Sequence, residues 1–293
     1  MIKEEETLSG FLAGHLNSIY ALAIAPNGKT LISGSADRTI QLWDLEERDQ
    51  IAMLTGHQDW VHSLAISSDG NTLISGSFDT NLKVWDLDTQ SEKYTLTGHS
   101  DRVYCVTLHP KEAIAYSGSN DKTIKMWDIS QGKEIRTLSH FPDSIYAILL
   151  SPDGNTLISG CANGTIYVND KSIPHAHAGS VTTLAISPNG FTLISGGIDG
   201  RIQLWDLETG QNLHTLSGHK DSITAVAIHP DGNHLISGSN DTTLKIWNIN
   251  TGKQEASVQG HGKAILAVAI SPNGNTVVSA SRNNDIKLWS WEG

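Results

Sequence analysis

Histidine, serine and aspartate recur along this chain at a spacing that suggests acid–base or nucleophilic chemistry. In one set, Ser75 and Asp79 follow His57 by 18 and 22 residues, and Trp85 comes after them. A histidine that takes a proton from a serine, with an aspartate that orients the histidine ring, is the arrangement of hydrolytic triads. The first hypothesis for this set is therefore a catalytic site.

The repetition of this set argues for a structural role instead. Five complete sets occur, and an active site does not need five copies in one chain. Buried polar groups need hydrogen-bond partners, and a network in which every member is paired makes a core rigid. We therefore expect buried hydrogen-bond networks; Ser75 and Ser77 are alternative members of one of them, and we favour Ser75. The other four sets are His15/Ser33/Asp37/Trp43, His99/Ser117/Asp121/Trp127, His177/Ser195/Asp199/Trp205 and His219/Ser237/Asp241/Trp247.

The sets belong to a longer unit that is written seven times. One unit runs from Gly56 to Asp86, with Gly-His at its start and Trp-Asp at its end. The units close near Trp43, Trp85, Trp127, Asn169, Trp205, Trp247 and Trp289, 42 residues apart except for one step of 36. The opening histidines are His15, His57, His99, His140, His177, His219 and His261. A period of about 40–45 residues with these two signatures is typical of a WD40 blade, and the chain resembles the WD40-repeat family over nearly its whole length.

Each unit contains short apolar runs of strand length, such as Val61–Ile66, Thr72–Ser77 and Leu82–Trp85. Turns separate the runs, as at Pro26-Asn27-Gly28, where glycine supplies a positive φ angle. A weaker fourth strand follows the Trp-Asp pair, as in Glu134–Leu138. Four antiparallel strands in each of seven units predict an all-β, seven-bladed propeller that forms a single domain over residues 1–293.

The two ends of the chain predict how the ring closes. The sequence stops just after a third strand, so the last unit lacks a fourth, whereas Glu6–Leu12 occupy the phase of a fourth strand before the first unit. A strand supplied by the N-terminal segment covers two exposed sheet edges at once. We expect Glu6–Leu12 to pair with Asp285–Trp291.

The fourth unit departs most from the repeat. Asn169 and Asn163 replace the Trp and the Asp, and few residues remain before the fifth unit. Pro174 cannot donate to a strand ladder. We expect a stunted fourth strand and an exposed edge at Thr165–Val168, which is either tolerated drift or a docking edge for a partner strand. The seventh unit is milder, with Asn283 at the place of the Asp.

The sequence predicts neither a metal site nor a cofactor. His175 and His177 have a spacing that could hold a metal ion. However, His177 is already assigned to one of the five sets. We therefore expect no metal at this pair.

The composition limits the partners and the compartment. A net charge of −11 argues against nucleic acid and against an anionic membrane surface, because both need a cationic face. No apolar run approaches the roughly 20 residues of a membrane span, and the acidic N-terminus has no apolar signal region. Cys105 and Cys161 lie in strands of different units, so we expect buried free thiols and a reducing, cytoplasmic environment.

Residues that do not repeat are the candidates for function. Trp60 is the one tryptophan, apart from the terminal Trp291, that has no repeat position. Five residues after the repeat histidine, two units carry tyrosine and one carries histidine, and the fourth unit adds a tyrosine shifted by its insertion. Together with Phe78 and Arg102, these candidates are Tyr20, Trp60, His62, Tyr104 and Tyr146.

The resemblance to WD40 propellers implies where these candidates lie. In such propellers, the loops between blades and the turns between second and third strands open on one face around the central channel. That face is the family's usual peptide- and protein-binding surface. The candidates would then form an arc on one side of the channel mouth, and tyrosine, tryptophan and arginine dominate binding hot spots. The alternative is that the tyrosines only pack against neighbouring blades.

We expect a non-catalytic interaction scaffold, monomeric, that holds a peptide or protein partner of unknown identity mainly on its second blade. One alternative is a structural module that self-associates through the edge of the fourth blade. Another is a propeller enzyme, but the arc offers no titratable pair beyond His62 and Arg102. Bacterial proteins that resemble this chain often carry such a propeller beside a kinase or an ATPase, so the chain is either such a domain or a stand-alone protein.

Overall fold

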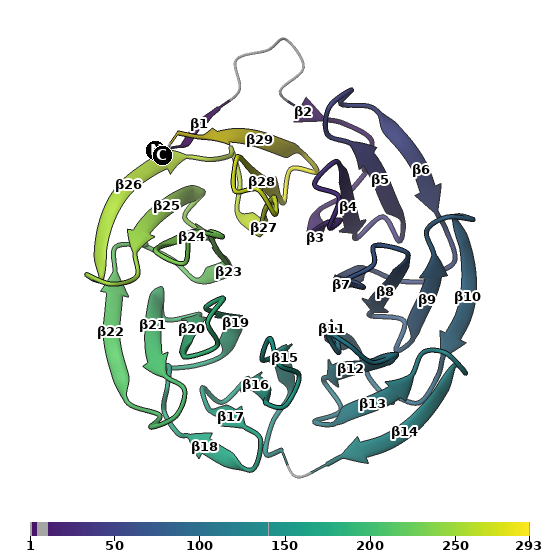
Figure 1. The fold of residues 1–293 in the computed structure, drawn as a ribbon, viewed down its shortest axis with the longest axis horizontal. Coiled ribbons are helices and arrows are strands. Elements are labelled where there is room, and N and C mark those ends of the chain that lie inside the picture. Colours follow the sequence, from purple (N-terminus) through teal and green to yellow (C-terminus); the bar gives the residue numbers. More distant parts are fainter. Residues whose placement is uncertain (1, 5–10, 140, 293) are drawn as a thin grey trace.

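The protein is a ring of seven blades around a central channel, which confirms the predicted all-β propeller (Figure 1). The computed structural model describes residues 2–4, 11–139 and 141–292. Within these ranges the regular secondary structure consists of strands alone, and each blade is an antiparallel sheet. Each of the first six blades begins with its innermost strand and ends with its outermost one, and the last blade takes its outer strands from the N-terminal segment.

The strands follow the repeat in fixed order. The first, innermost strands are β3 (Ile19–Ile24), β7 (Val61–Ile66), β11 (Val103–Leu108), β15 (Ile145–Leu150), β19 (Val181–Ile186), β23 (Ile223–Ile228) and β27 (Ile265–Ile270). The second strands are β4 (Thr30–Ser35), β8 (Thr72–Ser77), β12 (Ile114–Ser119), β16 (Leu157–Cys161), β20 (Thr192–Gly197), β24 (His234–Ser239) and β28 (Thr276–Ser281). The third strands are β5 (Ile40–Asp44), β9 (Leu82–Asp86), β13 (Ile124–Asp128), β17 (Ile166–Val168), β21 (Arg201–Asp206), β25 (Thr243–Asn248) and β29 (Ile286–Trp291). The fourth strands are β6 (Gln50–Leu54), β10 (Ser91–Leu96), β14 (Lys133–Leu138), β18 (Lys171–Ile173), β22 (Asn212–Ser217) and β26 (Lys253–Gln259).

Local sequence explains the tight turns between first and second strands. Gly28 and Gly70 have φ angles of 72° and 81°, a region that glycine enters without steric cost. The amide of Gly70 donates to the carbonyl of Ser67 at 2.9 Å, which closes the turn. The Ser67 hydroxyl in turn accepts the amide of Thr72 at 2.9 Å. Each turn thus reverses the chain so that the second strand starts beside the first.

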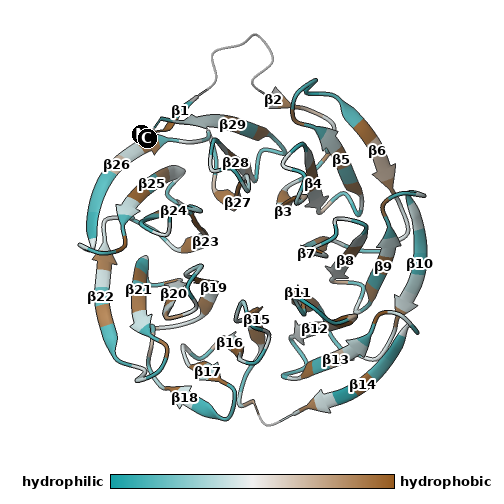
Figure 2. Ribbon diagram, viewed as in Figure 1, coloured by the Kyte–Doolittle hydropathy of each residue, from teal (hydrophilic) through white to brown (hydrophobic). Residues whose placement is uncertain are grey.

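The hydrophobic core lies between neighbouring blades. One cluster combines Ile74 and Leu82 of blade 2 with Val103, Ala115 and Trp127 of blade 3, and all five are buried. Burying apolar surface in this way contributes roughly 25 cal/mol per Å². The outer strands are more polar, and Figure 2 shows β10, β14 and β26 largely in hydrophilic colours. Each blade therefore depends on its neighbours for a buried face, which positions the inner strands around the channel.

The N-terminal segment closes the ring, as expected, but over a different range. β1 (Ile2–Glu4) and β2 (Phe11–Leu12) both pair antiparallel with β29, with Ile2 opposite Trp291 and Leu12 opposite Ile286 (Figure 1). The structure thus confirms the expected strand Glu6–Leu12 only at its last two residues, Phe11 and Leu12. Residues 5–10 lie outside the described residues. Ile2 extends the pairing because its side chain is buried in the cluster formed by blades 6 and 7.

The expectation of an exposed edge at Thr165–Val168 was wrong. β17 pairs with β18, with Ile166 opposite Ile173 and Val168 opposite Lys171. Asn169 has a φ of 50°, and it reverses the chain directly after β17, so the few residues left in this unit still supply a strand. The fourth strand is short, as expected, with only three residues.

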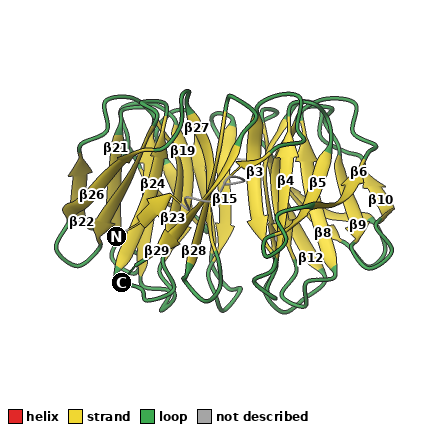
Figure 3. Ribbon diagram, turned by 90° about the horizontal axis from the view of Figure 1, so that it is seen from above, coloured by secondary structure: helices red, strands yellow, loops and turns green. Residues whose placement is uncertain are grey.

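The strands run between two faces that carry the loops (Figure 3). One face carries the loops that join successive blades and the turns between second and third strands; we call it the joining face. The amide of Phe78 donates to the carbonyl of Trp60 at 2.9 Å, so these two sets of loops touch there. The opposite face carries the turns between first and second strands. Across the described ranges, no helix has the length and apolar character needed to cross a membrane.

Candidate functional site

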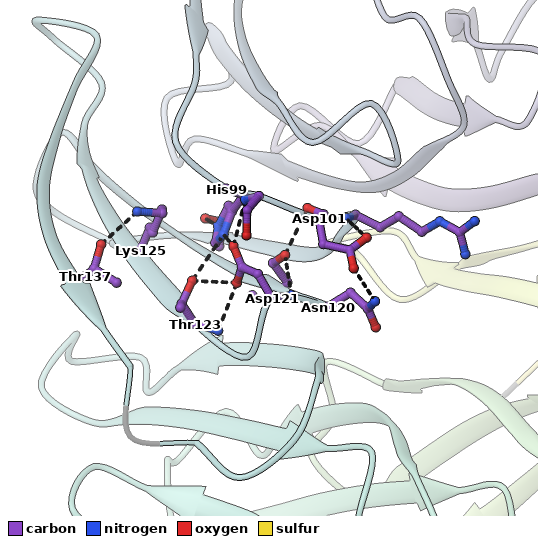
Figure 4. Close-up of polar contacts among 12 residues, drawn as sticks. His99, Asp101, Asn120, Asp121, Thr123, Lys125 and Thr137 are labelled. Atoms are coloured by element: carbon purple, nitrogen blue, oxygen red, sulfur yellow. Dashed lines mark hydrogen bonds and ion pairs between the residues drawn. The ribbon is translucent and has the colours of Figure 1, made fainter.

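The repeated polar set forms a connected hydrogen-bond network, which blade 3 illustrates (Figure 4). Nδ1 of His99 lies 2.8 Å from Oδ2 of Asp121, whose other oxygen accepts the Thr123 hydroxyl at 2.6 Å. Nε2 of His99 lies 2.7 Å from the Ser117 hydroxyl, which accepts the indole N–H of Trp127 at 2.9 Å. Because the ionised aspartate only accepts, Nδ1 carries the proton and Nε2 accepts from serine. Every member of the set is therefore paired.

The same connections join the other four complete sets. In blade 2 the Ser75 hydroxyl lies 2.7 Å from Nε2 of His57 and accepts the Trp85 indole N–H at 2.8 Å. Ser77 instead donates to the carbonyl of Asp59 at 3.1 Å, so Ser75 is the network member. The equivalent contacts are His15–Asp37, His15–Ser33 and Trp43–Ser33; His177–Asp199, His177–Ser195 and Trp205–Ser195; His219–Asp241, His219–Ser237 and Trp247–Ser237.

Blade 7 has a sixth network that the sequence did not reveal. Asn283 stands at the expected aspartate position, but Asp285 supplies the carboxylate instead, with Oδ1 at 2.9 Å from Nδ1 of His261. Ser279 joins His261 to Trp289 as in the other blades. Asp285 sits where threonine or asparagine stands in most units, and a carboxylate reaches the same ring nitrogen from there. In blade 4, His140 lies outside the described residues.

The network side chains are buried, which indicates that the networks are structural. Ser75 and Ser117 have no exposed surface, so a substrate cannot reach their hydroxyls. Burial raises the pKa of Asp79, but the hydrogen bonds from His57 and from the amides of Gln58 and Asn81 outweigh it and lower the pKa to about 2. The carboxylate is therefore ionised at neutral pH and holds the histidine ring in place.

The seven arc residues lie together at the joining face, in a chain of ring contacts. Trp60 stacks on Tyr20 and on Phe78, with ring centroids 5.3 and 5.2 Å apart. The guanidinium carbon of Arg102 lies 5.0 Å from the Phe78 ring centroid, within the range of a cation–π contact. The remaining neighbours in the chain are Tyr20–His62, His62–Phe78, His62–Tyr104, Phe78–Tyr104 and Tyr104–Tyr146. We call this group the aromatic arc.

His62 also connects two blades. Its Nδ1–H donates to the carbonyl of Tyr104 at 2.8 Å. Thr182 and Thr224 at the same repeat phase also bond to the next blade, each with its hydroxyl 2.5 Å from the carbonyl one position earlier in the repeat, at Ile223 and Ile265. Burial lowers the pKa of His62 to about 4, so the ring is neutral at pH 7. The position therefore has a structural role in addition to lining the arc.

The inner strands of all seven blades enclose a cavity of about 490 Å³. One side of its wall is aromatic, with Tyr20, His62, Tyr104 and Tyr146 from four successive blades. The other side carries the small or aliphatic residues Thr182, Thr224 and Leu266. The channel wall is therefore asymmetric in its chemistry although its backbone repeats.

A comparison with protein-family models agrees with this geometry. The model described as WD domain, G-beta repeat matches seven segments: residues 6–44, 48–86, 90–128, 132–170, 171–206, 210–248 and 252–290. The chain belongs to the WD40-repeat family. A search of curated proteins found no match for this WD40 protein. The family relationship thus covers nearly the whole chain, and WD40 propellers commonly serve as protein-interaction scaffolds.

One surface residue on the joining face of this WD40 protein had escaped the sequence reasoning. Leu16, directly after His15, has 88% of its surface exposed, and its amide donates to Asp37 at 2.9 Å. Gln58 and Ser100 are its polar counterparts in the next two blades. A comparison of this repeat phase would have found it, because most units carry a small or polar residue there. Leu16 adds an exposed apolar side chain to the face that carries the aromatic arc.

Proposed function

We propose that this WD40 protein is a non-catalytic scaffold that binds a peptide or protein segment of a partner on its joining face. The binding residues are those of the aromatic arc, with blade 2 at the centre because Trp60, His62 and Phe78 all come from it. The ring supplies a rigid frame, and the unrepeated side chains supply the specificity.

The observation that carries this proposal is the exposed aromatic surface around Trp60. Trp60 keeps 37% of its surface exposed while its ring lies between those of Tyr20 and Phe78. The stacked neighbours hold the indole in place, so little conformational entropy is lost when a partner covers it. Arg102 over the Phe78 ring adds a charged donor, and this combination of residue types dominates binding hot spots.

The test is a pull-down from lysate that compares wild type with the double variant Trp60→Ala/Tyr104→Ala. We expect the double variant to lose at least one partner that wild type retains, because both changes remove ring surface from the arc. Circular dichroism and a melting curve must first show that the variant is folded, since Tyr104 also contacts Tyr146.

A matched control exists on the opposite face. Phe191 lies directly after the turn between β19 and β20 and has 68% of its surface exposed. Phe191→Ala removes a comparable apolar area away from the arc and should leave the captured partners unchanged. Equal partner sets from wild type and the folded double variant would show that the arc is not the binding site.

The alternative of self-assembly through blade 4 has weaker support. β18 has three residues, and the side chains of Lys171 and Ser172 are exposed. A short edge strand with an exposed lysine is a usual protection against edge-to-edge pairing. A catalytic role is also less favoured, because burial lowers the pKa of His62 to about 4, which makes the ring a weak base, and its Nδ1–H is held by a carbonyl. The buried free thiols Cys105 and Cys161 support a reducing compartment such as the cytoplasm.

A further inference from the structure

A separate polar cluster lies on the opposite face, at the turn between β23 and β24. His229, Asp231 and His234 each offer one potential ligand atom, and these atoms lie within 4.8 Å of one another. Oδ2 of Asp231 is 3.0 Å from Nδ1 of His229 and 2.6 Å from Nδ1 of His234. The turn brings them together, because the amide of Gly232 donates to the carbonyl of His229 at 2.9 Å and Gly232 has a φ of 73°.

The second nitrogen of each ring already has an oxygen partner. Nε2–H of His229 donates to the carbonyl of Gly274 at 3.0 Å. Nε2 of His234 lies 3.2 Å from Oε2 of Glu255. In metal sites, a ligating histidine donates its other N–H to a carbonyl or carboxylate, which fixes the ring and leaves the ligand nitrogen bare. Both rings have this outer support, and both therefore turn Nδ1 towards Asp231.

The two carboxylate oxygens of Asp231 have different partners: backbone amides contact Oδ1, and the two histidine rings contact Oδ2. Oδ1 of Asp231 accepts the amides of Asn233 and His234 at 2.7 and 3.1 Å. The amide of Asp231 makes a longer contact of 3.2 Å with Nδ1 of His229. Oδ2 of Asp231 thus lies at hydrogen-bond distance from both rings. A metal ion would replace the protons of these hydrogen bonds, because histidine binds a metal ion through a deprotonated nitrogen.

We propose that His229, Asp231 and His234 bind one divalent transition-metal ion of the Zn²⁺ class. Two imidazoles and one carboxylate form a ligand set that suits Zn²⁺, whereas Ca²⁺ and Mg²⁺ prefer oxygen ligands. The side chains of Asp231 and His234 remain 31% and 26% exposed, so an ion and a water as fourth ligand have access from solvent. The competing explanation is a set of ordinary ion pairs between protonated histidines and Asp231.

The cluster is specific to one blade. The position of His229 is occupied by serine in four of the other turns, at Ser67, Ser151, Ser187 and Ser271. Trp291, which also has no repeat position, stacks on His229 with centroids 4.3 Å apart and meets His234 edge-on at 5.2 Å. His175 and His177 form no comparable ligand set, because both ring nitrogens of His177 are engaged by Asp199 and Ser195.

The ion would tie blade 6 to the blade that closes the ring. Gly274, which accepts from His229, lies in the turn between β27 and β28, and Trp291 ends β29. An ion that fixes the His229 ring therefore also fixes its contacts with blade 7. Because the ion binds the folded protein, it should stabilise the fold in proportion to its occupancy.

The experiment is calorimetric titration of the EDTA-treated, dialysed protein with zinc sulfate. We expect one ion per chain with a dissociation constant in the micromolar range or below, and no comparable heat with Ca²⁺ or Mg²⁺. His234→Gln and Asp231→Asn should each weaken binding about 100-fold or more. At about 100 times the dissociation constant, Zn²⁺ should raise the melting temperature of wild type by roughly 3–5 °C and leave that of His234→Gln unchanged.

The control is His175→Asn, which removes an exposed histidine outside the cluster and keeps a residue that tolerates the positive φ of 55° at that position. This variant should bind Zn²⁺ as wild type does. The proposal is overturned if wild type shows no saturable binding, or if folded His234→Gln and Asp231→Asn bind as tightly as wild type. Either result would leave the cluster as ion pairs only.

Discussion

At the scale of single residues, one serine hydroxyl joins two strands of a blade to the loop that enters it. Ser237 lies in β24 and contacts His219 ahead of β23 and Trp247 in β25. His219 in turn fixes Asp241, which accepts the amides of Lys220 in the entry loop and of Thr243 at the start of β25. Loss of one member leaves the others buried without a partner. The free-energy cost of such an unsatisfied buried group exceeds the net contribution of an average hydrogen bond to stability.

We therefore expect His219→Ala to lower the free energy of unfolding by about 1–3 kcal/mol at pH 7. Burial lowers the pKa of His219. Burial raises the pKa of Asp241, but hydrogen bonds from Thr243, Lys220 and His219 outweigh it and lower the pKa to about 2. Both groups take up protons more readily in the unfolded chain, so their contribution is present above about pH 6.5 and is lost as the pH falls towards 2.

Urea unfolding at several pH values measures this difference. The gap between wild type and His219→Ala should narrow as the pH falls from 7 towards 3. His175→Asn serves as the control, because His175 is exposed and belongs to no network. A gap that stays constant over this range would contradict the assigned protonation states.

At the scale of elements, ring closure depends on two short strands on one edge. β1 and β2 contribute three and two residues to the ladder on β29. These strands stabilise the ring by burying apolar side chains as well as by hydrogen bonds, because Ile2 and Leu12 are almost fully buried in different inter-blade clusters. The N-terminal segment thus fills the seam on both sides of blade 7.

Deletion of residues 1–12 should lower the melting temperature markedly, because it exposes the edge of β29 and both clusters. The finer change Ile2→Ala should cost about 2 kcal/mol or more, as expected for a buried isoleucine. Met53→Ala is the matched control, since Met53 lies on the outer strand β6 with 53% of its surface exposed. Differential scanning calorimetry is the measurement, and an unchanged melting curve for the deletion would disprove this closure.

At the scale of the whole molecule, charge and edge chemistry favour a separate ring. The net charge of −11 makes copies of the chain repel one another. The outer edges carry exposed charged residues, such as Glu92 and Lys93 on β10 and Lys133 and Glu134 on β14. Charged edge strands of this kind resist pairing between molecules.

We accordingly expect a monomer of 31.6 kDa in sedimentation velocity at micromolar concentration. Salt screens the repulsion between copies, so the measurement is best made at both low and physiological ionic strength. A dimer that persists at both would favour self-association through an edge strand over the peptide-binding scaffold.

The sequence alone determined the blade count, the strand order and the five complete networks. These features repeat, and local patterns of apolar runs, turns and spacing are enough to predict them. The repeat left Ser75 and Ser77 as alternatives, because both serines recur, and the hydrogen bonds of the structure settled the choice in favour of Ser75. The candidates of the aromatic arc were found by removing what repeats, which needs no coordinates.

Only the tertiary structure decided which side chains meet across blades or at turns. The stacking of Trp60 between Tyr20 and Phe78 joins residues of two blades, and it depends on how the blades pack around the channel. Asp285 replaces Asn283, and β18 forms in spite of its length, because backbone geometry lets a neighbouring residue or a sharp turn supply what the pattern lacks. The cluster of His229, Asp231 and His234 appears once a turn and the adjoining blade have oriented both rings, which residue spacing alone does not specify.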